Sequence, residues 1–334
     1  MTGRLQPAAI QAPGFQGLNS QDSEVTLESG YATSASNCII DRFGRLGSRR
    51  GWQYLTTDND TLDDTDPIEF IFEFKKTDGN YEIISAGGGK LFSGDVTLTE
   101  KPVRDGANAN DIPLAVSTGR FQGAALQDAS GAAALGELYL AQLGQPLLVY
   151  REVSSNYIFQ RVGDVGSVPT GLSTTSFDPD CIISAYGRNW AARISNNKTT
   201  VYYSNLLDGS IWTGAGTGLL DVSAIVGGND EIVAIATHNN FLIIFLQNNI
   251  VVYSGADDPS QLLLSDVIKG VGCIARDSVQ NTGTDLIFLS KSGVRSLART
   301  IQEKSMPMRE LSINVRDTLV RDIQNEVLTN IKST

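Results

Sequence analysis

The sequence predicts an all-β chain: a β-propeller built of repeated hairpins, with an extended N-terminal arm and a C-terminal amphipathic helix. Three observations predict this fold. Short apolar runs alternate with turn residues, these runs recur at blade-like intervals, and the last residues change to a helical period. We therefore divide the chain into an arm with a first strand (1–56), a propeller body (57–300) and a C-terminal helix (301–334).

The hairpins occupy the middle of the chain. β-Branched and aromatic residues fill their arms, while Asn, Gly and Ser occupy the bends, which is the composition of β-hairpins. The predicted hairpins lie within residues 81–94, 138–150, 190–204, 241–254 and 285–297.

The hairpin ends recur at a loose period. Phe92, Tyr150, Tyr203, Tyr253 and Leu297 are separated by 58, 53, 50 and 44 positions. A four-stranded propeller blade takes about 40 to 50 residues, so this spacing favours a propeller. An irregular β-sandwich, whose hairpins resemble each other as all hairpins do, is the open alternative.

One turn adds a further sign of a propeller. The segment 204–212 loosely resembles the Asp-box turn of sialidase-like propellers, with Asp208 and Trp212 in the bracing positions. That turn is a fold element, so it supports the propeller more than glycosidase activity. A glycosidase needs two carboxylates about 5 to 10 Å apart across a cleft. A single sequence cannot show such a pair.

The arm closes with a cluster of arginines in an acidic chain. Arginine beside aromatic residues suits nucleic-acid contact, and it equally suits the anchors of a protein interface. The overall acidity favours the protein interface. The cluster comprises Arg42, Arg45, Arg49 and Arg50, with Phe43 and Trp52 interleaved.

The end of the chain has a helical pattern. Apolar residues recur every four positions from Leu311, which predicts an amphipathic helix. Asn314 is the expected N-cap, and Asp317 falls in the first turn, where the helix dipole favours a carboxylate. The apolar face either binds another subunit or domain or caps the propeller. Its residues are Val315, Leu319, Ile323, Val327 and Ile331.

The amino-acid composition excludes several classes of function. The 334 residues include 26 Lys and Arg against 37 Asp and Glu, a formal net charge of −11, and 41% are hydrophobic. Such a chain can bury a core, and its charge repels phosphate backbones. No apolar run reaches the roughly 18 residues of a membrane span, and the start lacks a signal peptide's apolar region. We expect no membrane insertion.

Catalytic and metal-binding signals are weak. The single histidine, His238, lies in a polar turn, and no nucleophile elbow, zinc-protease motif or phosphate loop is present. We expect no enzyme activity and no cofactor. The weak metal candidates form one acidic run that departs from the EF-hand pattern, so we expect a solvated loop. They are Asp58, Asp60, Asp63, Asp64 and Asp66.

The cysteines predict a reducing compartment during folding. Cys38, Cys181 and Cys273 are odd in number, far apart and embedded in apolar, strand-like segments. No CxxC pair is present. This usage is typical of reduced core thiols.

The opening of the chain resembles that of the tail nozzle proteins of short-tailed bacteriophages, also called tail tubular protein B. The similarity runs through residues 13–23, 30–32, 35–41 and 43–51, and the segments 230–255, 272–279 and 283–297 are similar to propeller strands of that family. Together these segments cover about half of the chain. Family members continue past the position of Leu311 with further strands, whereas this sequence ends after one helix.

The resemblance implies a virion structural protein without catalysis. It implies a hexameric ring below the tail adaptor ring, with a tail fibre, spike or needle protein as a further partner and double-stranded DNA passing through the lumen. It implies assembly in the host cytoplasm and residence in the virion tail. The family's arm, which organises the first blade or a neighbouring subunit, matches Gly17, Leu18, Asn19, Asp22, Asn37, Asp41, Arg45 and Gly51.

The acidity suits such a conduit. Each phosphate that Lys or Arg neutralises would strengthen DNA binding and slow its passage. We hypothesise that Asp and Glu line the lumen and that the cluster from Arg42 to Arg50 faces a protein partner. The alternative function is a carbohydrate-binding or glycan-hydrolysing propeller used in host recognition. A cellular scaffold propeller is a third class, which the phage-like opening disfavours.

Overall fold

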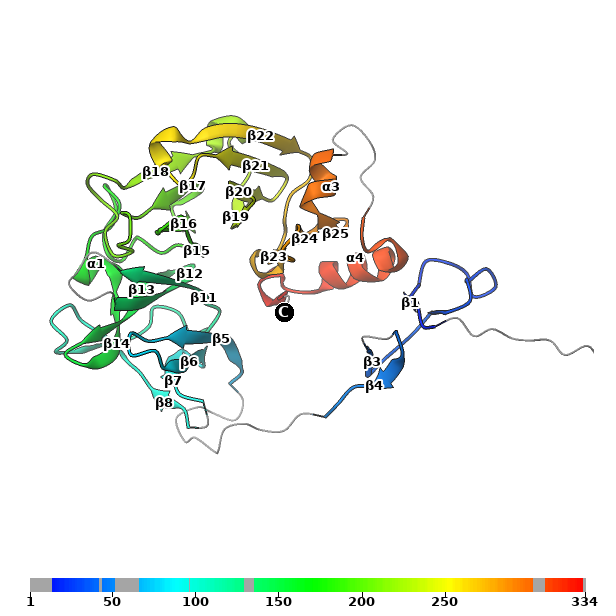
Figure 1. Ribbon diagram of the computed structural model, residues 1–334, viewed down its shortest axis with the longest axis horizontal. Helices are drawn as coiled ribbons and strands as arrows, with labels where there is room; N and C mark the ends of the chain where they lie inside the picture. The colour runs from blue at the N-terminus through cyan, green and yellow to red at the C-terminus, as the bar shows by residue number, and fades with distance from the viewer. Residues whose placement is uncertain are drawn as a thin grey trace, which may run out of the picture.

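The computed structural model describes residues 14–41, 44–51, 66–95, 97–128, 135–302 and 310–332. Within them, small sheets follow one another around a common axis, as Figure 1 shows. The described residues form five such sheets between Ile68 and Ser296, and each sheet is one blade of a β-propeller. The predicted all-β propeller is therefore confirmed, and the β-sandwich alternative is excluded.

Blades 1, 3 and 4 are antiparallel sheets in which the strands follow sequence order. Blade 1 contains β5 (Ile68–Lys75), β6 (Tyr81–Gly87), β7 (Lys90–Ser93) and β8 (Thr99–Glu100). Blade 3 contains β15 (Cys181–Ala185), β16 (Arg188–Ile194), β17 (Asn197–Tyr203) and β18 (Gly218–Asp221). Blade 4 contains β19 (Ile232–His238), β20 (Phe241–Leu246), β21 (Asn249–Ser254) and β22 (Leu263–Lys269).

Blade 2 is enlarged by a hairpin that precedes it in sequence. Its strands are β11 (Gln122–Asp128), β12 (Leu135–Gln142), β13 (Gln145–Val153) and β14 (Asn156–Arg161), to which β9 (Val103–Arg104) and β10 (Asp111–Ile112) are added. The strand β9 pairs with β14 in parallel. The outer edge of this blade is thereby extended beyond the usual four strands.

Blade 5 contains β23 (Gln280–Asn281), β24 (Leu286–Ser290) and β25 (Gly293–Ser296). The outer edge of β25 is covered by a later segment of the same chain. The Val294 N–H donates to Ser312 Oγ at 3.0 Å, and the Leu311 N–H donates to the Val294 carbonyl at 2.9 Å. An unpaired strand edge can template pairing with another chain, and this segment prevents that at β25.

The predicted hairpins are the central strand pairs of the blades: β6–β7, β12–β13, β16–β17, β20–β21 and β24–β25. These strands are detectable because blades on both sides bury them, as the largely buried β13 and β20 show. Strands buried on both faces are near-continuous apolar runs. The innermost and outermost strands lie outside these predicted hairpins. Among them, β19 is largely buried and falls in the segment 230–255 that was matched to propeller strands, whereas the outer strands β8 and β18 are short and partly exposed.

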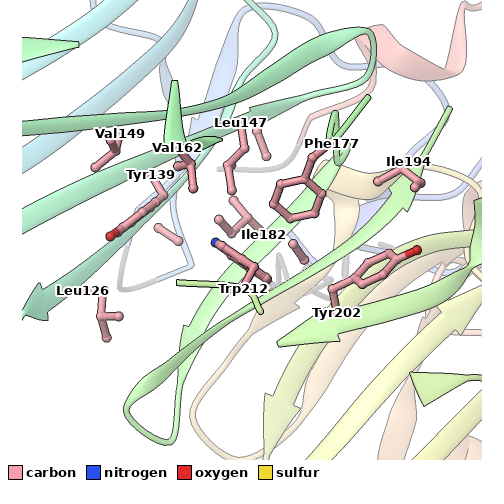
Figure 2. Close-up of a cluster of buried hydrophobic side chains, with 13 residues drawn as sticks. Leu126, Tyr139, Leu147, Val149, Val162, Phe177, Ile182, Ile194, Tyr202 and Trp212 are labelled. Atoms are coloured by element: carbon pink, nitrogen blue, oxygen red, sulfur yellow. The ribbon is translucent and has the colours of Figure 1, made fainter. Parts of the chain in front are cut away.

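Apolar clusters between neighbouring blades hold the propeller together. The cluster between blades 2 and 3, shown in Figure 2, joins Val149 of β13 to Ile182 of β15. Phe177 lies between Tyr202 and Trp212, with ring centroids 6.0 and 4.9 Å away. Both pairs have the edge-to-face geometry that aromatic rings prefer. These three aromatic rings pack between blades 2 and 3 and therefore limit how closely the two blades approach.

The Asp-box-like turn is a fold element here. Asp208 Oδ1 accepts hydrogen bonds from the Ser210 N–H at 2.9 Å and the Ser210 hydroxyl at 2.8 Å. The indole N–H of Trp212 donates to the Gly209 carbonyl at 2.8 Å, and the ring is buried. The predicted bracing roles of Asp208 and Trp212 are confirmed.

The arm contains β1 (Gly17–Leu18), which pairs with β2 (Tyr31–Ala32), and β3 (Cys38–Ile40), which pairs with β4 (Leu46–Ser48). The short helices of the body are α1 (Val162–Val165), α2 (Ser223–Val226), η1 (Pro259–Gln261) and η2 (Arg276–Ser278). After blade 5 come α3 (Leu297–Gln302), η3 (Ile313–Val315), α4 (Arg316–Asn325) and η4 (Leu328–Asn330). None of the helices in the described ranges has the length and apolar character needed to cross a membrane.

The C-terminal helix is shorter than the sequence predicts. The α-helix α4 begins after Val315, which makes no side-chain cap, so the assignment of Asn314 as N-cap is wrong. Asp317 does lie in the first turn. Glu326 has extended backbone angles, so Val327 and Ile331 fall outside α4 although they keep the four-residue spacing. The period continues beyond Asn325, but the α-helix does not.

The three cysteines are free thiols, and two of them belong to the core. Burial raises the pKa of Cys181 and of Cys273 above the ordinary thiol value. The Cys181 thiol also donates to the Val233 carbonyl at 3.1 Å. Cys38, in the arm, is half-buried. Since the thiolate is the reactive form, the two core thiols are protected twice, by burial and by protonation.

We predict that one thiol per chain reacts with Ellman's reagent in the native protein, and that all three react in guanidinium chloride. The fast thiol is Cys38, so Cys38→Ser should remove the native signal and leave the denatured count at two. A second fast thiol in the native protein would contradict the packing of Cys181 and Cys273.

Candidate functional site: the propeller axis and the N-terminal arm

Residues that precede the innermost strands meet at one end of the propeller axis. Arg120 precedes β11, Asp180 precedes β15 and Arg276 precedes β23. With Arg193 of β16 and Val233 of β19 they line a cavity of about 230 Å³. The cavity therefore gathers charged groups from three blades, although these residues are far apart in sequence.

Arg276 crosses this axis and is the most buried of the charged groups. Its Nη1 donates to Asp180 Oδ1 at 2.8 Å and to the Asp180 carbonyl at 2.7 Å, while Nη2 donates to the Arg120 carbonyl at 3.0 Å. Asp277 accepts from Nε at 2.9 Å. A single guanidinium thus ties blade 5 to blades 2 and 3, which uses the fork of donors that only arginine has.

The charge of Arg276 is fixed by its partners. Burial on its own would lower the pKa of the guanidinium, but Asp180 and Asp277 raise it above its ordinary value. Only 9% of the side chain is exposed. The cation is therefore compensated inside the protein by two carboxylates.

Arg193 extends the network to blade 4. Its Nη1 donates to Asp180 Oδ2 at 2.6 Å, and its Nη2 lies 3.9 Å from Glu231, which also accepts from Lys198 at 2.9 Å. Arg193 has a φ of +60° in a β-bulge of β16. A left-handed conformation is unfavourable for arginine, and a bulge of this kind re-aims a side chain. Here it directs the guanidinium to Asp180.

The C-terminal segment completes the closure of the axis. Leu328 and Ile331 line the same cavity, and the Lys332 ammonium donates to the Glu69 carbonyl at the start of β5. The Glu69 carboxylate accepts from Arg120 Nε at 2.8 Å and from the Gly119 N–H at 2.7 Å. Burial raises the pKa of Glu69, but these hydrogen bonds outweigh it and the pKa lies below its ordinary value. Figure 1 shows the chain end beside the axis.

His238 lies at the other end of the innermost strands. It ends β19 and lines a shallow polar depression with Tyr186, Asn239, Asn240 and Asn281. The predicted turn is formed by Asn239 and Asn240, which have positive φ, whereas His238 itself is the last residue of the strand and pairs with Phe241. Among the described residues, no three His, Cys, Asp or Glu side chains are grouped so that they could hold a metal ion.

The predicted arm residues form a small fold of their own. Gly17, with a φ of +130°, pairs with Tyr31, and Leu18 pairs with Ala32. Asn19 is buried: its amide donates to Asp22 at 2.8 Å. Its carbonyl oxygen accepts from the backbone N–H groups at 3.0 and 3.2 Å in the turn that follows. Asn19 and Asp22 therefore shape this turn.

This turn is attached to the start of α4. The Ser20 N–H donates to the Asn314 carbonyl at 2.9 Å, and the Ser20 hydroxyl lies 3.1 Å from that of Thr318. The arm and the C-terminal helix, which the sequence predicts as separate elements, are therefore in contact. Figure 1 shows β1 beside α4.

The second half of the arm is the β3–β4 hairpin. Asp41 accepts from the backbone N–H and the Nε of Arg45, each at 2.9 Å, and thereby closes the bend. Asn37, with a φ of +52°, accepts from the Arg49 N–H through its carbonyl. Arg49, Arg50 and Gly51 are exposed.

The helix α4 contacts β25 of the same chain. Leu319 and Ile323 are half-buried, as is Val315 at its start, whereas Val327 is exposed. The apolar face is thus only partly covered within the chain. The other predicted site residues fall outside the described residues, except for Asp66, which is exposed and approaches Gly88. Those outside are Arg42, Trp52, Asp58, Asp60, Asp63 and Asp64.

The sequence did not predict the axial network, which consists of Arg120, Asp180, Arg193 and Arg276. Arg276 lies in the segment 272–279, which was matched to a propeller strand by resemblance, but its residues 276–278 form the short helix η2. An arginine beside apolar residues is rarely buried without a partner, and that was the available signal. Its partner Asp180 is 96 residues away, and no spacing rule connects them.

Comparison with known proteins identifies no family. No family model matches the chain, and no curated protein matches it. Among solved structures, it is similar to the extracellular domain of a one-component system protein from B. thetaiotaomicron, with 14% identity and a TM-score of 0.43, covering 73% of this chain and 29% of that one. It is also similar to the WD40 domain of Neurospora crassa Pan2, with 14% identity and a TM-score of 0.38, covering 70% and 63%. The chain spans less than two thirds of either.

We predict that Arg276→Met lowers the free energy of unfolding by about 1 to 3 kcal/mol, because the Asp180 and Arg120 carbonyls and the Asp277 carboxylate lose their donor, while Arg193 still pairs with Asp180. Arg276→Lys should lose less, since an ammonium keeps the charge but not the fork of donors. Urea unfolding followed by tryptophan fluorescence measures both.

Arg299→Met is the matched control, because Arg299 is exposed on α3. Its free energy of unfolding should stay within about 0.5 kcal/mol of the wild type. Equal losses for the Arg276 and Arg299 variants would contradict the central role of the axial network.

Proposed function

We propose that the chain is a structural subunit of a bacteriophage tail, in the ring-shaped nozzle that extends the tail channel below the adaptor. The resemblance of residues 13–51 to the opening of nozzle proteins supports this role. The propeller fold is compatible with it. In this proposal the protein works in the virion tail, with copies of itself, the adaptor ring and a fibre, spike or needle protein as partners.

The arm is the observation that carries the proposal. The residues that match the nozzle family form a separate small fold beside α4, and its hairpin exposes Ile39, Ile40 and Leu46. Apolar side chains that remain exposed together in a folded chain mark interaction sites. An assembly subunit needs such a projecting surface, whereas a monomeric enzyme does not.

The conduit for DNA lies between subunits in this proposal. Arg276 and the segment from Leu328 to Ile331 occupy the axis of the propeller itself, so duplex DNA has no path there. A ring of subunits would enclose a separate lumen. The net charge of −11 then keeps DNA from binding the walls as it passes.

We predict that the purified chain forms closed rings, alone or on addition of the adaptor protein, with six subunits as the nozzle family implies. Light scattering after size exclusion gives the mass, and electron microscopy gives the symmetry. A chain that stays monomeric at every concentration, with and without the adaptor, would refute the proposal. A shift on a glycan array in that case would favour the host-recognition alternative.

A further inference from the structure

The charge of the chain is divided between two regions. Residues 66–285, which form blades 1 to 4 and the start of blade 5, contain 24 Asp and Glu against 13 Lys and Arg. Residues 38–51, around the arm hairpin, contain four arginines and one aspartate. Residues 286–332 contain eight Lys and Arg against five Asp and Glu. The blades are therefore acidic, and the arm and C-terminal region are basic.

The first surface of interest is the arm patch, defined as Ile40, Leu46, Arg49 and Arg50. Ile40 pairs with Leu46 across the β3–β4 hairpin, so their side chains are neighbours on one face. Both are 51% exposed. The arm patch thus combines an apolar face with two exposed arginines, a combination that is enriched in protein interfaces.

The second surface is the outer patch, defined as Leu206, Leu207, Leu263, Asp257 and Asp258. The leucines are between 40% and 68% exposed, and both aspartates are exposed. This patch combines apolar groups with negative charge. It is formed by the loop between β17 and β18 and by the connection from β21 into β22.

Both loops of the outer patch converge on the turn between β15 and β16. The Leu207 N–H donates to the Gly187 carbonyl at 2.7 Å, and a Cβ on Gly187 would lie 3.0 Å from Leu206. From the other loop, Ala256, which precedes Asp257, belongs to the apolar cluster against which Tyr186 of the same turn packs. The leucines and the aspartates therefore lie on one surface.

We propose that the arm patch of one copy binds the outer patch of the next copy. This rests on the proposed ring function and specifies its contact. The two surfaces match in kind, because each offers exposed aliphatic side chains and their charges are opposite. Like charges would oppose pairing of two arm patches or of two outer patches, and such repulsion suppresses wrong partners.

The geometry favours a contact between copies. Figure 1 places β3 and β4 at the lower right and β18 at the upper left, on opposite sides of the propeller, and Ser20 holds the arm against α4. Two different surfaces on opposite sides of one chain give a head-to-tail contact. Repetition of that contact generates a ring when the rotation closes.

The test uses two full-length variants that keep the local fold. Arg49→Glu with Arg50→Glu reverses the arm patch. Asp257→Arg with Asp258→Asn makes the outer patch positive, and the asparagine can still cap η1, where Asp258 accepts from the Ser260 N–H. Glu73→Arg with Asp95→Asn, on exposed positions of blade 1, is the control for the outer-patch variant, because it makes the same change of charge. Circular dichroism and thermal unfolding verify that each variant folds.

Sedimentation velocity, with and without the adaptor protein, measures assembly at low and high salt. Each patch variant alone should associate about tenfold or more weakly than the wild type, which corresponds to at least about 1.4 kcal/mol. A mixture of the two variants should recover assembly, since each then meets a complementary charge. The wild type should associate more weakly at high salt, and the control variant should behave as the wild type.

The possible results distinguish the proposed ring function from the proposed contact between the arm patch and the outer patch. If the wild type forms rings and both patch variants do so equally well, the contact is wrong and the ring function stands. If each variant fails alone and the mixture fails too, a head-to-tail contact between these patches is wrong. If the wild type never associates, with or without the adaptor, both proposals fall.

Discussion

The closure of the propeller depends on the ion pair between Arg276 and Asp180. In the described residues, the first and last blades share no strand, so β-sheet pairing does not close the circle. Polar contacts close it instead, with Arg276 joined to blades 2 and 3 and Lys332 joined to the start of blade 1. Buried ion pairs repay their desolvation only when the geometry is good and the remaining donors are satisfied. The donors of Arg276 that reach Asp180, Asp277 and Arg120 meet that condition, and the apolar clusters between the blades supply the remaining cohesion.

The sequence predicted the fold class because the central strands of each blade are buried on both faces. Trp190, Val201 and Phe245 lie in segments that are apolar enough to recognise without a partner sequence. The inner strands differ in this signal, since β19 is apolar and largely buried whereas β23 has only two residues, both exposed. The axial network could not be predicted, since its residues come together only through the circular arrangement of the blades. The helix boundary failed for a local reason: an apolar period specifies a face, and the backbone of Glu326 leaves the helix while that period continues.

Resemblance to a family motif singled out residues of the arm, but it did not predict which of their neighbours are exposed. Resemblance singled out a group of arm residues that form turns and pairs within the arm in the structure. They are Gly17, Leu18, Asn19, Asp22, Asn37, Asp41 and Arg45. Their conformations explain these residue types, since Asn19 and Asp41 accept backbone hydrogen bonds in tight turns. The exposure of Ile40 and Leu46 does not follow from the motif. Only the structure shows that these two side chains of the β3–β4 hairpin are exposed.

The contact between Lys332 and Glu69 has a consequence for the order of events during synthesis. The two residues are 263 positions apart, and the segment at the axis is translated after all five blades. Blades 1 to 4 can pack pairwise as they leave the ribosome, because each apolar cluster joins sequence neighbours. The axis, however, stays open to water until the last contacts form. During synthesis, the contacts between neighbouring blades therefore form first, and the long-range contact between Lys332 and Glu69 forms last.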